Sequence, residues 1–312
     1  MGDPAGIGPE ITVRAWQART LDSLPAFFVL GDPRLYQSVP VQEIADPADV
    51  PAVFASALPV LPVALPHPAR PSQPDTAFGP SIIASIDRAV AMVKDGAARA
   101  VVTNPIAKAL LYRAGFRAPG HTEYLARLCG LADTAAVMML VGGGLRVVPA
   151  TIHVPLAEVP LTLTPALLES VVRITLADLH HRFGIERPRV TVAGLNPHAG
   201  EAGRIGTEER DWIAPLCDRL RGEGLAVTGP APADALFHAE ARQSYDAAVC
   251  CYHDQALIPV KTLAFHDGVN VTLGLPIVRT SPDHGTAFDI AGTGLARPDS
   301  LIAALKLAAD LA

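Results

Sequence analysis

The sequence predicts an α/β fold, because short apolar runs typical of strands alternate with segments that have helical periodicity. The clearest strand-like runs are residues 97–103, 190–195 and 247–252. The chain has 312 residues, of which 50% are hydrophobic, so it can build a substantial core for two domains or one large α/β unit.

Helix ends are indicated by caps, prolines and glycines. Thr164 and Pro165 predict a helix start, because a hydroxyl caps free N–H groups and proline suits the first turn, and Gly184 closes this helix. Thr207 begins another helix, and Ser300 is expected to cap the last one.

Glycines and prolines define two further segments. Gly142–Gly144 separate two apolar runs, so we interpret residues 138–148 as a hairpin. The alternative is a phosphate-binding loop, which the strand-like runs on both sides disfavour. Residues 40–80 contain ten prolines, as linkers do, but the interspersed Val, Leu and Phe favour an ordered, extended surface connection.

Composition excludes several classes of protein. No apolar run approaches the length of a membrane span, and residues 1–4 have neither the basic segment nor the apolar stretch of a signal peptide. A net charge of -6 without a basic stripe argues against nucleic-acid binding. The cysteines at 129, 217, 250 and 251 match no zinc spacing, so we expect reduced thiols and a cytoplasmic location.

Three histidines lie in short polar motifs, each directly after an apolar run: His153 in TIHVPL, His198 in GLNPHAGE and His253 in YHDQ. Strand ends of this kind are where α/β proteins build their sites. Imidazoles without cysteine partners suit a divalent metal that keeps open positions for water or substrate. Any one histidine is more simply a structural residue, and the spacings match no local motif, so the metal hypothesis depends on all three together.

Two carboxylates accompany these histidines. Asp254, next to His253, is a candidate acceptor that orients the imidazole, and Asp234 is a second carboxylate that can serve the same site.

A second cluster has the features of an anion site. His121 and Thr122, in the motif GHTE after Pro119, stand at a predicted helix start, where free N–H groups and a hydroxyl receive phosphate or carboxylate. The alternative is a plain N-cap. Three further polar residues follow the third histidine and are candidate clamps for an anionic substrate rather than solvated side chains: Lys261, Asn270 and Arg279.

A nucleotide site is less clearly indicated. Residues 2–10 form a glycine-rich loop that enters a helix with Pro9 near its first turn, but they do not match G-x-G-x-x-G, so no Rossmann site is predicted. The polar, glycine-rich segments 274–276 and 283–287 are candidates for shaping a nucleotide pocket.

Together these motifs resemble the 4-hydroxythreonine-4-phosphate dehydrogenase family of pyridoxal phosphate biosynthesis. The resemblance runs in order through MGDPAGIGPE, GHTE, LNPHAGE, YHDQ and GVNVTLGLP. It implies a fold like those of isocitrate and isopropylmalate dehydrogenases, with two α/β/α domains around a central cleft. The implied domains are residues 1–118 with 275–312 on the cofactor side, and residues 119–274 with the metal ligands and the dimer interface.

The resemblance also implies the cofactors, partners and roles of individual residues. It implies NAD or NADP, one divalent ion (zinc, magnesium or cobalt), a small phosphorylated hydroxy amino acid as substrate, and a homodimer with the active site at its interface. Neither nucleic acid nor a membrane is an implied partner. By position, the implied metal ligands are His153, His198 and His253, contributed across the dimer interface. The implied substrate contacts are His121, Thr122, Lys261, Asn270 and Arg279. The candidates for the general base are Asp254, Asp234 and Lys261.

The sequence departs from the family pattern in two places. It begins inside the glycine-rich motif, without the short strand that normally precedes this motif, and the loss of a parallel strand is expected to expose a neighbouring edge. Residues 265–268 replace a segment that more often carries an arginine before the glycine.

Three alternatives remain open. A dehydrogenase of four-carbon acid-sugar phosphates, such as 4-phospho-D-threonate or 4-phospho-D-erythronate, would keep the same metal and phosphate contacts. A phosphate acyltransferase of similar fold needs neither metal nor NAD, and the three histidines disfavour it. A binding protein without catalysis is disfavoured by the presence of both clusters.

Overall fold

The computed structural model describes residues 1–118 and 120–312, which form two compact α/β units. Unit 1 comprises Met1–Asp133 and Leu275–Ala312, and unit 2 comprises Thr134–Gly274. The predicted α/β class is confirmed. The predicted domain division between residues 118 and 119 stays a prediction. In the structure, residues 120–133 belong to the compact unit 1, where the Tyr124 hydroxyl donates a hydrogen bond to Asp87.

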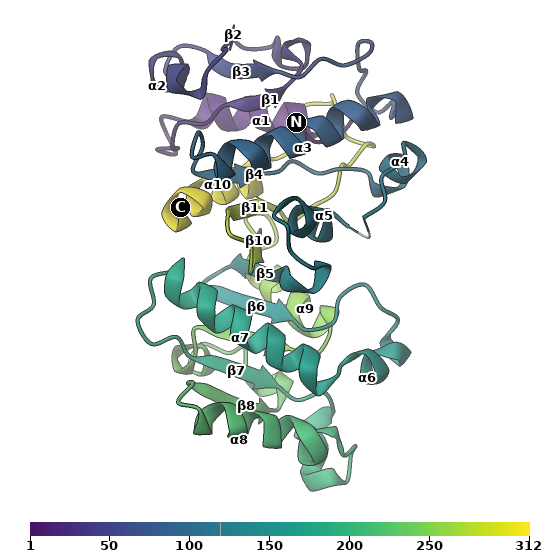
Figure 1. Cartoon of the computed structure of the whole chain (residues 1–312), viewed down its shortest axis with the longest axis vertical. Helices are drawn as coiled ribbons and strands as arrows, with labels where there is room; N and C mark the ends of the chain where they lie inside the picture. The colour runs from purple at the N-terminus through teal and green to yellow at the C-terminus, as the bar shows by residue number, and fades with distance from the viewer. Residues whose placement is uncertain (119) are drawn as a thin grey trace. The chain divides into compact units, whose positions relative to one another are not determined.

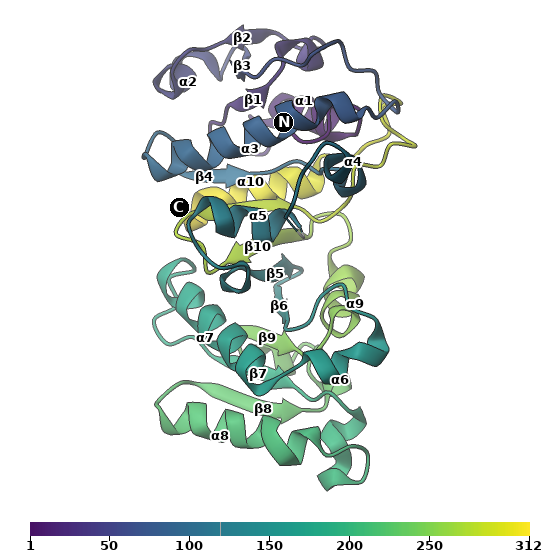
Figure 2. The same cartoon turned by 45° about the vertical axis from the view of Figure 1, so that its right-hand side comes forward.

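Unit 1 contains two groups of parallel strands and the helices that cover them (Figure 1). The strands are β1 (Val29–Gly31), β2 (Val41–Glu43), β3 (Leu58–Pro62), β4 (Ala100–Val102) and β11 (Val278–Pro282). The helices are α1 (Gly8–Ala18), α2 (Val50–Val53), α3 (Gly79–Lys94), α4 (Lys108–Arg113), α5 (His121–Leu128) and α10 (Asp299–Leu311). One sheet has the order β1-β3-β2, and β4 pairs with β11. Helix α3 packs against β1 and β4, and α10 packs against β4, β11 and α1 (Figure 2).

Two expectations for unit 1 are corrected. Residues 40–80 are ordered, as predicted, but they include the buried strand β3 rather than only a surface connection, because Leu58, Val60 and Leu61 supply a core face despite the prolines. Ser300 does not cap the last helix. Helix α10 already begins at Asp299, and the Ser300 hydroxyl instead accepts a hydrogen bond from the Asp283 N–H at 3.0 Å.

A cavity of about 440 Å³ in unit 1 is lined by residues of both β1 and β4 and by apolar side chains of α3 and α10. Among the described residues, β1 pairs only with β3 and β4 only with β11, so one edge of each strand borders the cavity without a strand partner. Met1 also lines this cavity. The cavity therefore has room for one more extended segment between the two edges.

Unit 2 contains a six-stranded run in the order β10-β5-β6-β9-β7-β8. Its strands are β5 (Val137–Gly142), β6 (Leu145–Pro149), β7 (Val190–Ala193), β8 (Val227–Ala231), β9 (Ala247–Cys250) and β10 (Val269–Leu273). Its helices are α6 (Val159–Thr162), α7 (Pro165–His181), α8 (Ala214–Gly222) and α9 (His253–Leu263). The strands β6, β9, β7 and β8 are parallel, and β10, β5 and β6 are antiparallel to one another in turn.

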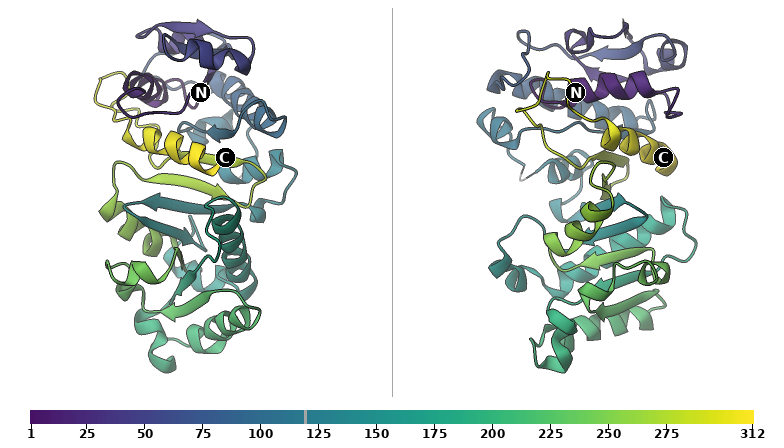
Figure 3. Two further views of the ribbon diagram at one scale, coloured as in Figure 1. Left: turned by 90° about the vertical axis from the view of Figure 1, so that its left-hand side faces the viewer. Right: turned by 180° about the vertical axis from the view of Figure 1, so that it is seen from behind.

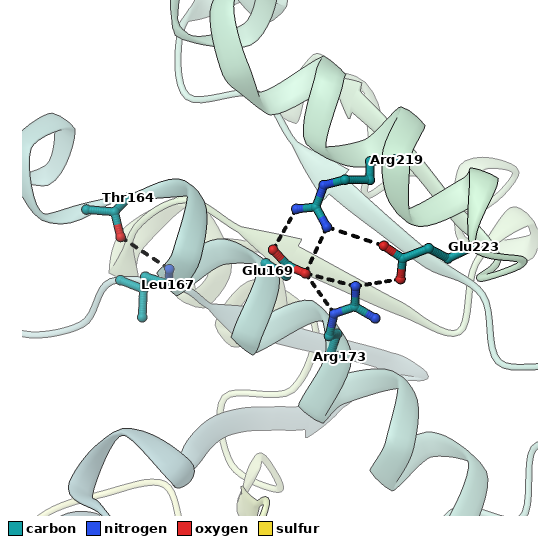
Figure 4. Close-up of polar contacts among 6 residues, drawn as sticks. All are labelled: Thr164, Leu167, Glu169, Arg173, Arg219 and Glu223. Atoms are coloured by element: carbon teal, nitrogen blue, oxygen red, sulfur yellow. Dashed lines mark hydrogen bonds and ion pairs between the residues drawn. The ribbon is translucent and has the colours of Figure 1, made fainter.

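The predicted hairpin and helix starts of unit 2 are confirmed. Strands β5 and β6 are antiparallel and joined at Gly143 and Gly144, which both have positive φ. The Thr164 hydroxyl accepts a hydrogen bond from the Leu167 N–H at 3.2 Å at the start of α7 (Figure 4). Helix α7 packs against β5, β7, β9 and β10. Helix α9 packs against β5, β6 and β9, and it lies in front of these strands in the right-hand view of Figure 3, which shows the molecule from behind.

Helices α7 and α8 are joined by a cluster of four charged side chains (Figure 4). Glu169 accepts hydrogen bonds from Arg173 and Arg219, and both arginines also contact Glu223. The two guanidinium groups hold the pKa of Glu169 at about 2. Because this cluster is largely exposed, its contribution to the free energy of unfolding is small, and its main effect is to orient the two helices.

Within the described ranges, no single helix is long and apolar enough to cross a membrane. The segments Leu156–Thr162 and Pro165–His181 have the necessary length and composition only when taken together, and they meet at a bend of 87°.

The cavity beside β1 and β4 gives the first testable prediction. Joining about five strand-forming residues, alternating Val and Ile, ahead of Met1 should raise the melting temperature by several degrees, because each 1 kcal/mol is worth roughly 2–4 °C in a chain of this size. The added segment would pair with both edges.

Thermal melts at neutral pH measure this effect, with a Gly-Ser-Pro extension of equal length as control. Equal melting temperatures for the two extensions would contradict the prediction.

Candidate functional site

The three motif histidines lie after the carboxyl ends of three neighbouring parallel strands of unit 2. His153 follows β6, His253 begins α9 directly after β9, and His198 follows β7, in the strand order β6-β9-β7. Neighbouring strands are about 4.8 Å apart, so parallel pairing brings the three loops to one edge of the sheet. The predicted placement of the histidines at strand exits is confirmed.

His153 and His253 lie side by side, with ring centroids 5.7 Å apart. Asp254 contacts the Nδ1 atom of His253 through Oδ1 at 2.7 Å. This contact favours the tautomer with the proton on Nδ1 and leaves Nε2 as an acceptor for a metal ion. The expected role of Asp254 as the acceptor that orients His253 is therefore seen in the structure.

His198 lies on a turn of unusual backbone conformation. The segment Pro197–Gly203 includes six consecutive residues with positive φ, from His198 at 53° to Gly203 at 90°. Its side chain is exposed. His153 is also exposed and has a φ of 24°, so two of the three histidines have backbone conformations that are rare for residues with a side chain.

The donor set fits a divalent metal in part. Imidazoles are the ligands that zinc and cobalt favour, and the pair His153 and His253 has one ring oriented by a carboxylate. Among the described residues, however, no group of three or more His, Cys, Asp or Glu side chains is gathered closely enough to hold a metal ion. To hold a metal ion, this pair would need a further ligand.

The remaining candidates in unit 2 lie at different places around the sheet. Asp234 follows β8, the next parallel strand, and is exposed. Lys261 lies on α9 eight residues after His253, on the same helical face and about 12 Å along the axis. Asn270 is on β10, and its Oδ1 atom is buried without a hydrogen-bond partner in the described part of the chain.

A second cluster, in unit 1, brings together Arg279 of β11, Thr103 and His121. Arg279 is 4% exposed, donates a hydrogen bond to the Thr103 hydroxyl at 2.6 Å, and has its Nη2 atom 3.4 Å from the Nδ1 atom of His121. His121 is the first residue of α5, so Thr122 and the free N–H groups of the first turn are next to it.

Burial and charge keep His121 neutral. Burial, followed by the positive charges of Arg279 and Lys108, lowers the pKa of His121 well below 6.5. Since Nδ1 faces a guanidinium donor, the proton belongs on Nε2, which is buried and has no hydrogen-bond partner among the described residues. Burial also lowers the pKa of Arg279 to about 10, which leaves it charged at neutral pH. A neutral N–H donor beside a buried cation is suited to an anionic oxygen.

Sequence reasoning missed three residues of this cluster: Thr103, Asn104 and Lys108. Thr103 and Asn104 directly follow β4, and the Asn104 Oδ1 atom is buried without a partner in the described ranges. The ammonium group of Lys108 lies close to Gly120 at the start of α5, since a Cβ placed on this glycine would be 3.4 Å from the Lys108 Nζ atom. The polar residues directly after β4 could have identified this part of the cluster, because the same pattern, polar residues after an apolar run, identified the three histidines. Pro119, named in the predicted motif, lies outside the described residues.

The two segments considered for a nucleotide pocket differ in their surroundings. In unit 1, the glycine-rich loop lies against residues 283–287, since the Ile7 N–H donates to the Thr286 carbonyl at 2.9 Å and a Cβ on Gly6 would be 2.8 Å from the same oxygen. In unit 2, the Gly274 N–H donates to Asp178 at 2.8 Å, which indicates a structural role for that glycine.

Polar clusters at strand exits on two α/β units define the class of this protein as an α/β enzyme. The family model described as pyridoxal phosphate biosynthetic protein PdxA matches residues 23–308. The chain is 57% identical to a 4-hydroxythreonine-4-phosphate dehydrogenase of Methylorubrum extorquens, covering 100% of this chain and 93% of the relative. It is 55% identical to the protein of that name from Roseobacter denitrificans, covering 100% and 95%.

Solved structures agree with these relatives. The crystal structure of 4-hydroxythreonine-4-phosphate dehydrogenase from Klebsiella pneumoniae matches with a TM-score of 0.89 at 39% identity and covers 100% of this chain and 97% of that one. A terephthalate 1,2-cis-dihydrodiol dehydrogenase from Burkholderia xenovorans LB400 matches with a TM-score of 0.67 at 30% identity, covering 99% and 96%. The chain belongs to the PdxA family of 4-hydroxythreonine-4-phosphate dehydrogenases, as the motifs predicted.

The anion cluster of unit 1 gives the second prediction. In an NMR titration of the histidine rings, His121 should show no protonation at pH 6.5, and adding inorganic phosphate should raise its pKa because the anion offsets the charge of Arg279. An Arg279→Met variant should raise the pKa of His121 part of the way and abolish the response to phosphate. A wild-type His121 that is half protonated near pH 6.5, or that ignores phosphate, would contradict this assignment.

Proposed function

We propose that this chain oxidises 4-phosphohydroxy-L-threonine at C3 with NAD or NADP and a divalent metal ion (zinc, magnesium or cobalt). Oxidation and loss of carbon dioxide give 3-amino-2-oxopropyl phosphate for pyridoxine 5′-phosphate biosynthesis, in the cytoplasm. The supporting observation is the pair of adjacent imidazoles, His153 and His253, in a chain of this family. The names of the relatives support the substrate.

The substrate's acidic groups are assigned to the cluster around Arg279. The guanidinium of Arg279, the Nε2–H of His121 and the Thr122 hydroxyl would donate to phosphate or carboxylate oxygens. Arg279 is held by Thr103, so its charge is fixed in place before the anion binds. Asn270 and Lys261 are the further contacts proposed from the family motif.

The histidines are assigned to the metal. His253, oriented by Asp254, and His153 would bind it through ring nitrogens. A bound divalent ion would act as a Lewis acid that lowers the pKa of the C3 hydroxyl. NAD or NADP would accept the hydride from C3.

The general base is proposed from three residues with different surroundings. Asp254 is engaged with His253, so its first role is to orient that ring. Lys261 shares a face of α9 with His253, and Asp234 lies exposed after β8. A base must come within hydrogen-bond reach of the hydroxyl it deprotonates. All three residues are therefore kept as candidates for the base.

A homodimer is part of the proposal. His153 and His253 alone are too few for a metal ion, and the family motif implies ligands contributed across a dimer interface. Unit 2 also exposes large apolar side chains close to these histidines in the sequence: Leu161 is 82% exposed, Phe265 69% and Ile258 63%. Exposed apolar side chains of this size favour an interface with another chain. We propose that His198 of the partner subunit completes the metal site.

Four-carbon acid-sugar phosphates are the second candidate substrates. The neighbour from Burkholderia xenovorans is named for a dihydrodiol rather than an amino acid, so this fold also carries dehydrogenases of other hydroxyl compounds. The metal and anion contacts proposed above do not involve the substituent at C2. Substrate preference must therefore be measured.

The third prediction tests the reaction. Reduction of NAD and of NADP should be seen with 4-phosphohydroxy-L-threonine, should be abolished by a chelator, and should return when a divalent ion is added back. Parallel assays with 4-phospho-D-threonate and 4-phospho-D-erythronate decide between the two substrate classes. Faster turnover of either acid-sugar phosphate would reassign the substrate. Activity that persists in chelator would refute the metal requirement.

The fourth prediction concerns the metal ligands. His198→Ala should lower turnover by at least about 100-fold and weaken divalent-metal binding, with the circular dichroism spectrum unchanged. His181→Ala, an exposed histidine at the end of α7, is the matched control and should retain activity and metal. An active His198→Ala protein with its metal retained would remove His198 from the site.

A further inference from the structure

The loop that carries His198 has a left-handed backbone along most of its length. His198, Ala199, Glu201 and Ala202 have φ values of 53°, 49°, 45° and 55°, and Gly200 between them has 79°. Residues with a Cβ disfavour this region, and a run of four such residues in one turn needs support from its surroundings. The position of the His198 ring depends on this turn keeping its shape.

The support comes from a buried carboxylate, Glu209. Its side chain is 3% exposed. Its Oε1 atom accepts a hydrogen bond from the Asn196 N–H at 2.6 Å, and Oε2 accepts one from the Asn196 side-chain amide at 2.9 Å. Both oxygens are therefore used to hold Asn196, the residue that begins the turn.

Glu209 also fills the inner side of the turn. A Cβ on Gly200 would lie 2.7 Å from Oε2, and a Cβ on Gly194 would lie 3.3 Å from Oε1. Glycines at these two positions allow the carboxylate to approach the backbone closely. Glu209 is itself the first residue of a π-helical turn, Glu209–Ile213, a backbone feature that is frequent at functional sites.

The start of the same loop is tied to the His253 segment. Gln255 accepts a hydrogen bond from the Cys251 N–H at 2.6 Å and donates one to the Gly194 carbonyl at 2.7 Å. Gln255 thus joins the ends of β9 and β7, while Glu209 holds the turn that follows β7. The two contacts are independent, and both fix the segment on which His198 stands.

We infer that Glu209 is a positioning residue that holds the His198 turn in its left-handed conformation and so presents the imidazole to the divalent metal. The inference rests on the proposed metal role of His198. Glu209 is neither a ligand nor a base in this assignment, because it is buried and both of its oxygens accept hydrogen bonds from Asn196.

The fifth prediction tests this inference first in the metal-free protein. Glu209→Gln keeps the side-chain size but turns an N–H group toward a donor of Asn196. Hydrogen exchange of the segment 196–206, measured by mass spectrometry, should become at least about tenfold faster in this variant than in the wild type. Gly200→Ala, which retains Glu209, should also speed exchange, because the added methyl group displaces the carboxylate and because alanine disfavours the φ of 79° at this position.

The matched control is Glu169→Gln. Glu169 also lies in unit 2 and accepts hydrogen bonds from Arg173 and Arg219, but on the surface between α7 and α8 (Figure 4). This variant should leave exchange of the segment 196–206 unchanged. Equal exchange in Glu209→Gln and the wild type would overturn the inference. If Glu209→Gln fails to fold, Asn196→Ala, which removes the side-chain amide that Glu209 binds, carries the test.

The second readout is the affinity for Co²⁺, by titration calorimetry and by the visible absorption of the bound ion. Glu209→Gln should weaken Co²⁺ binding about 10- to 100-fold and alter the spectrum, as loss of a residue that orients a metal ligand does. Glu169→Gln should bind as the wild type does. Unchanged affinity and spectrum in Glu209→Gln would overturn the inference, whereas a wild type that binds no Co²⁺ would overturn the proposed metal role. In that case, hydrogen exchange still decides whether Glu209 holds the turn.

Discussion

Parallel pairing of β6, β9, β7 and β8 is the constraint on which the candidate metal site depends. Each of these strands is followed by one of the polar residues in question: His153, His253, His198 and Asp234. Parallel strands end at the same edge, so His153 and His253 lie side by side without any local motif, while His198 and Asp234 reach the same edge without joining this pair. A shift of one residue in the register of β6 or β9 would turn the side chains of that strand to the other face of the sheet. It would also displace the loop that follows and separate His153 from His253.

The two units stabilise charge in different ways. In unit 1, burial leaves Arg279 charged and His121 neutral, so the cluster has one positive charge and an N–H donor before any ligand arrives. In unit 2, the imidazoles are exposed or half-buried, and one is oriented by Asp254. The first arrangement favours an anion and the second a cation.

The sequence predicted those features that follow from local chemistry. Strand ends, the hairpin at Gly143 and the Thr164 cap depend on neighbouring residues, and each was predicted correctly. Ser300 was misassigned because its partner, Asp283, is distant in the sequence and competes with the helix for the hydroxyl. Glu209 was not identified as part of the site because its partner, Asn196, is reached through a turn whose left-handed conformation no propensity predicts. Sequence reasoning therefore located the loops and left the contacts that shape them unknown.

A comparison of two carboxylates in unit 2 shows why the His198 turn is better explained by function than by stability. Glu169 is exposed and paired with two arginines, an arrangement that costs little to form. Glu209 is buried, and within the described residues it accepts hydrogen bonds from Asn196 without a lysine or arginine partner. Burying a carboxylate on neutral donors is costly, and so is a left-handed turn made largely of residues with side chains. An ordinary loop with an exposed glutamate would avoid both costs. Retaining the two together is reasonable only if the fixed position of His198 has a use, such as metal binding.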